Sequence, residues 1–273
     1  MSVSGPQVDA AAVGAWSARV RAAWRTLTGG SSVGDEARPT LVACSGGADS
    51  AALAIILGEV PRARIVIAHV AHDLRPAELV NDDAAAVLGL ARRLGRPCVL
   101  LDAPVGPGNA EAEARRSRYA ALERAAVRLG IGSIATGHHC HDQFETMVMA
   151  LLRGGSPGAV AGMPPVRDSG APGVRLLRPM LSADPAGAGA VCRAFGLKPR
   201  TDHTNADPAF LRARMRRVTL SELAEQTEGL AERLATSRER LLARSESGQV
   251  PRSAKNERTS ASSRSSSATL DTL

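Results

Sequence analysis

Short apolar runs alternate with longer helical runs across the middle of this chain. The apolar runs are TLVAC, RIVIAHV, PCVLLD and GSIAT, and a stretch of helical character follows each of them. Strands and helices that alternate in this way build parallel βαβ units, in which buried strands read as continuous apolar runs. Between about 40 and 195 the pattern predicts an α/β fold, a Rossmann-like parallel sheet with helices on both faces.

The remaining segments suggest a division of the chain into four units. A packing helix is expected at about Val8–Leu27, and two helical runs, Asp207–Leu223 and Glu228–Ser245, are expected beside or beneath the sheet. After Met163, PPVRDSGAPG predicts a Pro- and Gly-rich connection, followed by VRLLRPML and a helix near Ala186–Phe195. The expected units are an N-terminal helix and linker over 1–39, the sheet domain over 40–200, a helical extension over 201–246 and a disordered Ser/Arg-rich tail over 247–273.

Composition narrows the class of protein. No stretch of the 273 residues approaches the roughly 20 uncharged apolar residues of a membrane span, and the N-terminus does not resemble a signal peptide. A cytoplasmic protein without membrane contact is therefore expected, and its four cysteines, none in a C-x-x-C pair, are expected to be buried thiols. A net charge of +7 favours an anionic partner, and aromatics at 2% favour recognition by charge and shape over base stacking.

The segment LVACSGGADS carries the clearest chemical signal. An apolar strand runs into two glycines, which let the backbone approach an anion, and then into a helix start, which offers unpaired N–H groups. The loop lacks the lysine of a Walker motif, and a carboxylate in it could bind a metal ion, here Mg²⁺, that bridges phosphates. The alternative is an ordinary Gly-Gly turn. The predicted phosphate loop consists of Ser45, Gly46, Gly47, Ala48, Asp49 and Ser50.

Two further segments place polar side chains at the same edge of the predicted sheet. In AHVAHDLRP, His69, His72 and Arg75 are expected to follow the second strand, near the ligand edge or as solvated loop residues. In EAEARRSRYAAL, Arg115 and Arg118 share one helix face with a tyrosine. These arginines could clamp phosphates or transition-state charge, or belong to a surface helix rich in ion pairs.

The segment GHHCHDQFET begins a helix directly after the fourth predicted strand. His138, His139, Asp142 and Glu145 are expected to gather at the carboxyl edge of the sheet, with the two carboxylates one helical turn apart. Two carboxylates this close form a cation site. A metal ion and a simple capped helix start are the competing interpretations.

These segments together resemble a known family. SGGADS resembles the signature of the PP-loop ATP pyrophosphatases, which cleave ATP to an adenylated intermediate and pyrophosphate. The resemblance narrows to the tRNA(Ile)-lysidine synthetases over about Leu41–Leu220 and rests on four more segments: AHVAHDLRP, EAEARRSRYAAL, ATGHHCHDQFETMVMALLRG and RTDHTNADPAFLRARMRR.

The resemblance implies an activity. Members of the family use ATP and Mg²⁺ to adenylate the wobble cytidine of tRNA(Ile) with a CAU anticodon, and L-lysine then displaces AMP to form lysidine. Members are often dimers, so a homodimer is the inherited expectation. Members of the family have two successive aspartates at the positions of His141 and Asp142. Thr201 and Ala213 replace an acidic residue and an asparagine that are usual in the family.

The resemblance also implies roles for individual residues. Those expected at the nucleotide, besides the phosphate loop, are His69 and His138. Those expected to take part in catalysis are Asp49, Arg115, Arg118, Asp142 and Glu145. Those expected to bind substrate are Asp142 and Glu145, which would receive the lysine ammonium, and Arg212, Arg214 and Arg216, which would contact RNA phosphate or a neighbouring acidic helix.

Two other functions are compatible with the same loop. A tRNA-thiolating PP-loop enzyme would share the adenylation step, but the absence of a C-x-x-C pair disfavours it. A non-catalytic ATP- or RNA-binding homologue is the second alternative, favoured by a C-terminal part shorter than family members commonly have.

Overall fold

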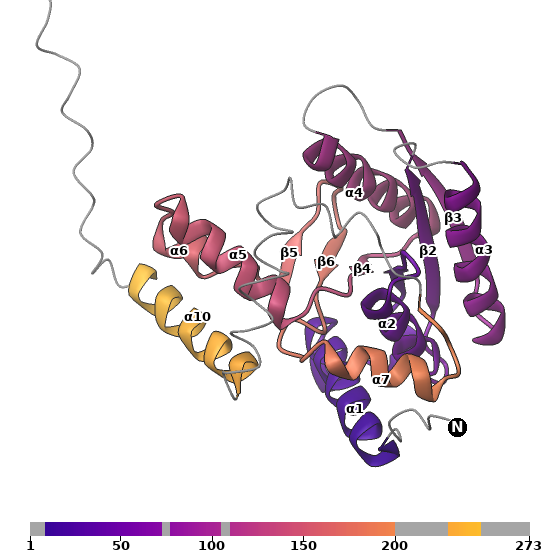
Figure 1. The fold of residues 1–273 in the computed structure, drawn as a ribbon, viewed down its shortest axis with the longest axis horizontal. Helices are drawn as coiled ribbons and strands as arrows, with labels where there is room; N and C mark the ends of the chain where they lie inside the picture. Colours follow the sequence, from indigo (N-terminus) through magenta and orange to yellow (C-terminus); the bar gives the residue numbers. More distant parts are fainter. Residues whose placement is uncertain (1–8, 73–76, 105–109, 200–228, 247–273) are drawn as a thin grey trace, which may run out of the picture.

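The computed structural model of the chain describes residues 9–72, 77–104, 110–199 and 229–246. Its centre is a six-stranded sheet with the order β3-β2-β1-β4-β6-β5 (Figure 1). All neighbouring strands are parallel except β5, which pairs with β6 in the antiparallel sense. The predicted α/β fold is confirmed. The strands are β1 (Thr40–Ala43), β2 (Ile65–His72), β3 (Cys98–Ala103), β4 (Ser133–Ala135), β5 (Val166–Asp168) and β6 (Arg175–Leu177).

Helices connect the strands and precede them. The first helix begins at Ala10 because the Asp9 carboxylate accepts hydrogen bonds from the backbone N–H groups of Ala11 and Ala12, as an N-cap residue does. Two short 3₁₀ turns, Gly30–Ser32 and Asp35–Ala37, lead from it to β1. The α-helices are α1 (Ala10–Leu27), α2 (Ala48–Gly58), α3 (Ala77–Arg93), α4 (Ala110–Leu129), α5 (Cys140–Leu152), α6 (Pro157–Val160), α7 (Ala186–Ala194) and α10 (Leu230–Glu246).

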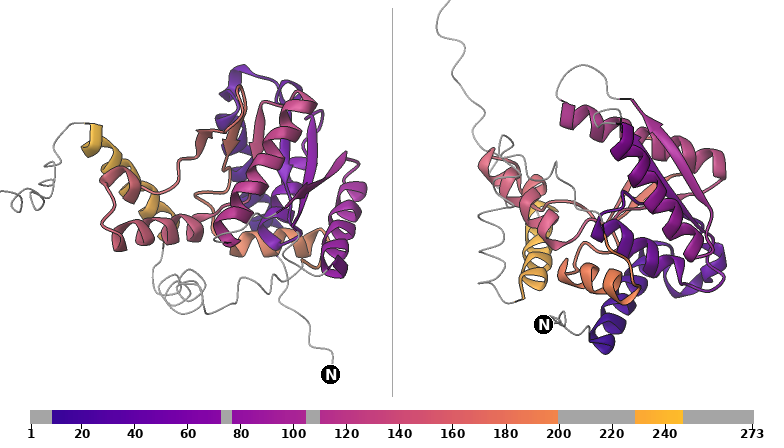
Figure 2. Two further views of the ribbon diagram at one scale, coloured as in Figure 1. Left: turned by 90° about the horizontal axis from the view of Figure 1, so that it is seen from above. Right: turned by 45° about the vertical axis from the view of Figure 1, so that its right-hand side comes forward.

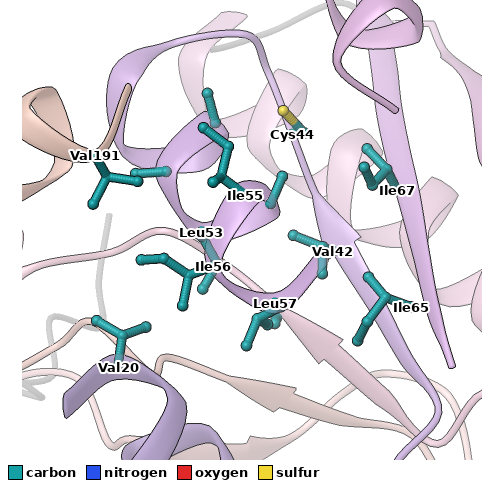
Figure 3. Close-up of a cluster of buried hydrophobic side chains, with 14 of the residues drawn as sticks. Val20, Val42, Cys44, Leu53, Ile55, Ile56, Leu57, Ile65, Ile67 and Val191 are labelled. Atoms are coloured by element: carbon teal, nitrogen blue, oxygen red, sulfur yellow. The ribbon is translucent and has the colours of Figure 1, made fainter. Parts of the chain in front are cut away.

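Alternate strand residues enter two separate cores. Val42, Ile65 and Ile67 pack with residues of α1, α2, α3 and α7 on one face (Figure 3). Leu41 and Val66, their neighbours in sequence, pack with α4 on the other face. Both faces of the central strands are buried, which explains why these strands read as unbroken apolar runs.

The segment after Met163 differs from expectation. It forms the hairpin β5–β6, in which Arg167 pairs with Leu176, and it adds two strands to the sheet where a connection was predicted. Each strand has only three residues, too few for a period-two pattern to stand out beside the Gly and Pro residues of SGAPG. The predicted helix that follows is confirmed as α7.

The last described helix, α10, packs against α5 and α6, whereas it was expected beside or beneath the sheet (Figures 1 and 2). Leu234 of α10 is buried in a small cluster with Cys140 and Met147 of α5. Helix α10 therefore packs on an apolar stripe of α5. The predicted helix Asp207–Leu223 and the predicted tail 247–273 lie outside the described residues. Within the described helices, none is long and apolar enough to cross a membrane.

Candidate functional site

The loop between β1 and α2 closes through a serine hydroxyl. Ser50 Oγ accepts a hydrogen bond from the backbone N–H of Ser45 and donates one to the carbonyl oxygen of Gly47, both at 3.1 Å. Ser45 Oγ lies 3.1 Å from Ser50 Oγ. Gly46 has φ +90°, a left-handed conformation that side chains rarely adopt, so glycine is needed at this turn.

The start of α2 offers backbone donors. Gly47 is the N-cap residue and makes no side-chain capping bond in the described structure, so the first turn, with Ala48 and Asp49, presents N–H groups that no cap side chain occupies. Asp49 is 39% exposed at its side chain. Backbone N–H groups and the positive end of the helix dipole attract an anion, as predicted for a phosphate loop.

The loop after β4 lies directly against the start of α2. A Cβ atom added to Gly137 would stand 3.0 Å from the carbonyl carbon and oxygen of Asp49 and from the nitrogen of Ser50. This close approach follows from the pairing of β1 with β4, which brings the carboxyl ends of both strands to one edge of the sheet. Polar groups from the two loops therefore share one surface.

His139 connects the two loops. Its Nε2 atom lies 3.5 Å from Oδ2 of Asp49 and 3.4 Å from Oδ2 of Asp142. The backbone N–H of His141 donates to Nδ1 of His139 at 3.2 Å, which makes Nδ1 an acceptor. In the neutral imidazole the proton then lies on Nε2, where it faces the two carboxylates.

The carboxylates of α5 occupy different surroundings. Asp142 accepts a hydrogen bond from the backbone N–H of His139 at 3.0 Å and completes a capping box at the start of the helix. The capped helix start proposed as an alternative is thus present. Glu145, one turn later, is 5% exposed. A carboxylate at this depth requires a partner, because burial removes it from water.

Of the two histidines expected near the nucleotide, His138 follows β4 as predicted. Its Nδ1 lies 2.8 Å from Oγ1 of Thr136. Burial lowers the pKa of His138 to about 4, the carboxylate of Asp142 opposes this change, and the guanidinium groups of Arg178 and Arg115 add to it. The imidazole is therefore neutral at physiological pH.

The position expected for His69 was wrong. It lies inside β2, where it pairs with Leu100, because β2 continues to His72 alongside β3. The side chain is buried, and its Nδ1 lies 3.0 Å from the carbonyl oxygen of Cys44 at the end of β1. His69 thus borders the strand that leads into the phosphate loop. Arg75 lies outside the described residues.

The arginines of α4 differ in their contacts. The guanidinium of Arg115 stands 5.3 Å from the centre of the Tyr119 ring, a cation–π distance, and both belong to the helix face that was predicted. The Arg118 side chain is exposed. Arg212, Arg214 and Arg216 lie outside the described residues.

In this loop, Asp49 would hold a magnesium ion together with the oxygens of a bound phosphate. Within the described part of the chain, no three His, Cys, Asp or Glu side chains gather as metal ligands. Mg²⁺ commonly binds one or two carboxylates together with substrate phosphates and water, which requires little more from the protein than Asp49.

The prediction of buried thiols is confirmed for three of the four cysteines, whereas Cys98 is only half-buried. None of them forms a disulfide, and Cys44, Cys140 and Cys192 are buried. Burial raises the pKa of Cys44 and Cys192 to about 11 and that of Cys140 to about 12. The thiolate, which is the nucleophilic form, is therefore disfavoured at these three positions.

Sequence reasoning assigned no individual role to three residues that contribute to this edge. They are Thr136, which contacts His138; His139, which joins Asp49 to Asp142; and Arg178, which influences His138. The position of Thr136 just after a predicted strand was the available signal. The contacts of His139 and Arg178 depend on how the loops pack.

Comparison with known proteins agrees with the fold and the loop described above. The family model of the PP-loop domain matches residues 21–223. The tRNA(Ile)-lysidine synthase of Salinispora arenicola is 43% identical, with 69% of this chain and 57% of that protein covered. The enzyme of the same name from Symbiobacterium thermophilum is 41% identical, with 68% and 40% covered, and that from Novosphingobium aromaticivorans is 38% identical, with 78% and 63% covered. The chain thus spans about half the length of such relatives.

The fold also resembles a solved structure. The U34-tRNA thiolase NcsA of Methanococcus maripaludis, determined with its [4Fe-4S] cluster, superposes with a TM-score of 0.66. The alignment covers 85% of this chain and 80% of that one at 15% sequence identity. This likeness concerns the fold alone.

Proposed function

This chain belongs to the PP-loop domain family, and from that membership we propose that it is a tRNA(Ile)-lysidine synthase. The reaction is the ATP-dependent ligation of L-lysine to the wobble cytidine of tRNA(Ile) with a CAU anticodon. It is a carbon–nitrogen ligation that passes through an adenylated cytidine and releases pyrophosphate and AMP. The names of the relatives and the residues at the carboxyl edge of the sheet support this proposal.

In the first step, the loop from Ser45 to Ser50 holds the ATP phosphates. The N–H groups at the start of α2 and the serine hydroxyls orient the triphosphate. Asp49 would hold Mg²⁺, which neutralises phosphate charge when bound. The carbonyl oxygen of the cytosine ring forms a bond to the α-phosphorus while the bond to the departing pyrophosphate breaks. His69 and His138 border the nucleotide on either side of β1.

In the second step, Asp142 and Glu145 receive the lysine ε-ammonium, which must lose a proton before its nitrogen can attack. The nitrogen then forms a bond to the ring carbon, and AMP leaves with the oxygen it had adenylated. Arg115 and Arg118 stabilise negative charge that develops in the transition states. His141 stands where the family has a further aspartate, so this chain has one carboxylate fewer for the ammonium.

The observation that carries this proposal is the contact of His139 with two carboxylates. Its Nε2 atom lies within 3.5 Å of Asp49 and of Asp142. The residue proposed to serve the phosphates and the residue proposed to serve the amine are therefore separated by one imidazole ring. Such proximity is what a ligation between an activated base and an amine requires.

The RNA contact is proposed for the arginines at 212, 214 and 216, which would neutralise backbone phosphates. The excess of basic over acidic residues, +7, is consistent with a polyanionic substrate. By the same family relationship, we propose a homodimer.

The deciding experiment measures pyrophosphate release from ATP with and without an unmodified tRNA(Ile) transcript and lysine. We expect release to depend on the transcript, and radiolabelled lysine to enter the RNA. A thiolating enzyme would release pyrophosphate but place no lysine in the RNA, and a non-catalytic homologue would bind ATP without releasing pyrophosphate. Either result would refute the proposed function.

A further inference from the structure

Three arginines from separate elements gather around Tyr119, the one tyrosine of the chain. The guanidinium of Arg115 stands 5.3 Å from the centre of its ring and that of Arg167 stands 5.4 Å from it. Arg178 is close enough that Tyr119 raises its pKa, whereas burial, which dominates, and the charges of Arg167 and Arg115 lower it. We call Arg115, Arg167 and Arg178 the arginine cluster.

Within the described residues, no carboxylate pairs with the arginine cluster. Arg167 donates to the carbonyl oxygen of Asp168 at 3.0 Å, and Arg178 donates to that of Pro164 at 2.6 Å. By contrast, Arg116, next to Arg115 on α4, binds the Glu113 carboxylate at 2.8 Å. Arg115 therefore differs from its neighbour Arg116 in having no carboxylate partner among the described residues.

Without a bound anion, the buried position of Arg178 lowers the stability of the folded protein. It is 4% exposed, and its Nε atom is buried without a hydrogen-bond partner. A buried charge without a counter-charge lowers stability, and an unpaired buried donor lowers it further. An anion bound at the cluster would satisfy both deficits.

The arginine cluster lies on a different side of the site from the phosphate loop. Arg178 directly follows β6, which pairs with β4, whereas the phosphate loop follows β1, on the other side of β4. Since neighbouring strands are about 4.8 Å apart, the ends of β1 and β6 are separated by roughly 10 Å. A phosphate held at Ser45–Ser50 is therefore a different group from an anion held at the cluster.

We propose that Arg115, Arg167 and Arg178 bind one oxyanion of the acceptor substrates, on the side of β4 opposite the phosphate loop. Guanidinium groups suit this task, because they present paired N–H donors to carboxylate or phosphate oxygens. The inference rests on the proposed function for its choice of acceptors, which carry two kinds of oxyanion: the α-carboxylate of lysine and the backbone phosphates of the RNA. Asp142, Arg178 and Arg115 all influence the pKa of His138, so these charged groups lie near the same imidazole.

Arg167 offers the cleanest variant. Replacing Arg178 would also remove its hydrogen bond to Pro164 and disturb the hairpin, whereas within the described residues the Arg167 side chain hydrogen-bonds only to the carbonyl of the next residue. The matched control is Arg175→Gln, since Arg175 is exposed, belongs to the same hairpin and lies at the opposite end of β6. Both variants remove one positive charge.

Two activity arms identify the source of the oxyanion. If lysine supplies the oxyanion, Arg167→Gln raises the KM for lysine about tenfold, which is the effect of losing one hydrogen bond between charged groups. The use of cadaverine, which lacks the carboxylate, remains unchanged. If RNA supplies it, the variant weakens binding of an anticodon stem-loop about tenfold and lowers its salt dependence. In both arms Arg175→Gln behaves as wild type.

A third arm tests the arginine cluster without any activity. Sodium sulfate should raise the Tm of the wild type and of Arg175→Gln more than that of Arg167→Gln, compared with sodium chloride at equal ionic strength. Equal behaviour of the two variants in all three arms would overturn the proposal. The wild type could ligate no lysine and yet gain more Tm from sulfate than Arg167→Gln does. That result would refute the proposed function and retain the oxyanion site.

Discussion

The Nε2 atom of His139 lies 3.5 Å from Oδ2 of Asp49, so a side chain at the start of α5 reaches the carboxylate at the start of α2. The same nitrogen lies 3.4 Å from Asp142. Two helices that begin at neighbouring strand ends thus share one imidazole between their first acidic residues.

Asp49→Asn should lower the rate of pyrophosphate release by about 100-fold or more, because a metal-bridged phosphate contact contributes several kcal/mol to the transition state. Ser45→Ala should impair the same step. The fold should remain intact by circular dichroism, since the Asp49 side chain is 39% exposed. The matched control is Glu59→Gln at the other end of α2. Wild-type turnover in Asp49→Asn would remove the phosphate-loop assignment.

Asp142→Asn and Glu145→Gln should impair the use of lysine more than the binding of ATP. Each loses a charge-assisted contact to the ammonium, worth roughly 1.5–3 kcal/mol. Asn at 142 can still accept the hydrogen bond from the His139 N–H, so the capping box survives. The measurement is the dependence of the rate on lysine at saturating ATP and tRNA. A shift confined to the ATP or magnesium dependence would instead identify a metal site.

The pKa of His138 predicts a loss of stability in acid. The unfolded imidazole takes up a proton near 6.5, whereas burial lowers the folded pKa to about 4. Protonation therefore favours the unfolded chain, and the free energy of unfolding should fall between these values by up to about 3 kcal/mol. Urea denaturation at several pH values measures the fall. His138→Asn should show a smaller one, and an equally steep fall in both proteins would contradict the assignment.

Thr40→Val should destabilise the protein by about 1–3 kcal/mol, the cost of leaving a buried donor unpaired. Trp24 is fully buried, and its Nε1 donates to Oγ1 of Thr40 at 3.1 Å, which fixes α1 to the start of β1. Urea denaturation gives the difference. Thr26→Val removes a hydroxyl that bonds only within α1, at an exposed position, and should change stability little. Equal effects at both positions would count against this docking contact.

Replacing Arg214 and Arg216 by glutamine should weaken tRNA binding and flatten its salt dependence by up to about one unit per lost phosphate contact. ATP binding should be unchanged. Binding titrations over a range of salt concentrations give both quantities. Unaltered affinity and slope would exclude these arginines, and a large loss on deletion of the residues after Ser245 would move the RNA contact to that segment.

The order of elements and the position of the phosphate loop were accessible from sequence. TLVAC, RIVIAHV and GSIAT are mainly apolar and do not alternate with a period of two, because β1, β2 and β4 are buried on both faces. The loop with Gly46 combines a strand end, a left-handed turn and a helix start, and each leaves a local signature. Local patterns sufficed for these features.

The short hairpin β5–β6 and the contacts between distant segments were not accessible. The hairpin β5–β6 has strands too short for a pattern, and its Arg178 meets Tyr119 across a long separation in sequence. His69 was expected after a strand because the end of a strand depends on its neighbour, here β3, which extends the pairing to His72. The contacts of His139 with Asp49 and Asp142 depend on the packing of two loops.

Gly137 fixes a dimension of the site that no rotamer can alter. Its α-carbon allows the loop after β4 to rest on the main chain of Asp49 and Ser50, where a methyl group would be 3.0 Å from three backbone atoms. The distance between the loop after β4 and the start of α2 is therefore set by backbone packing, and substitutions of the surrounding side chains leave it unchanged.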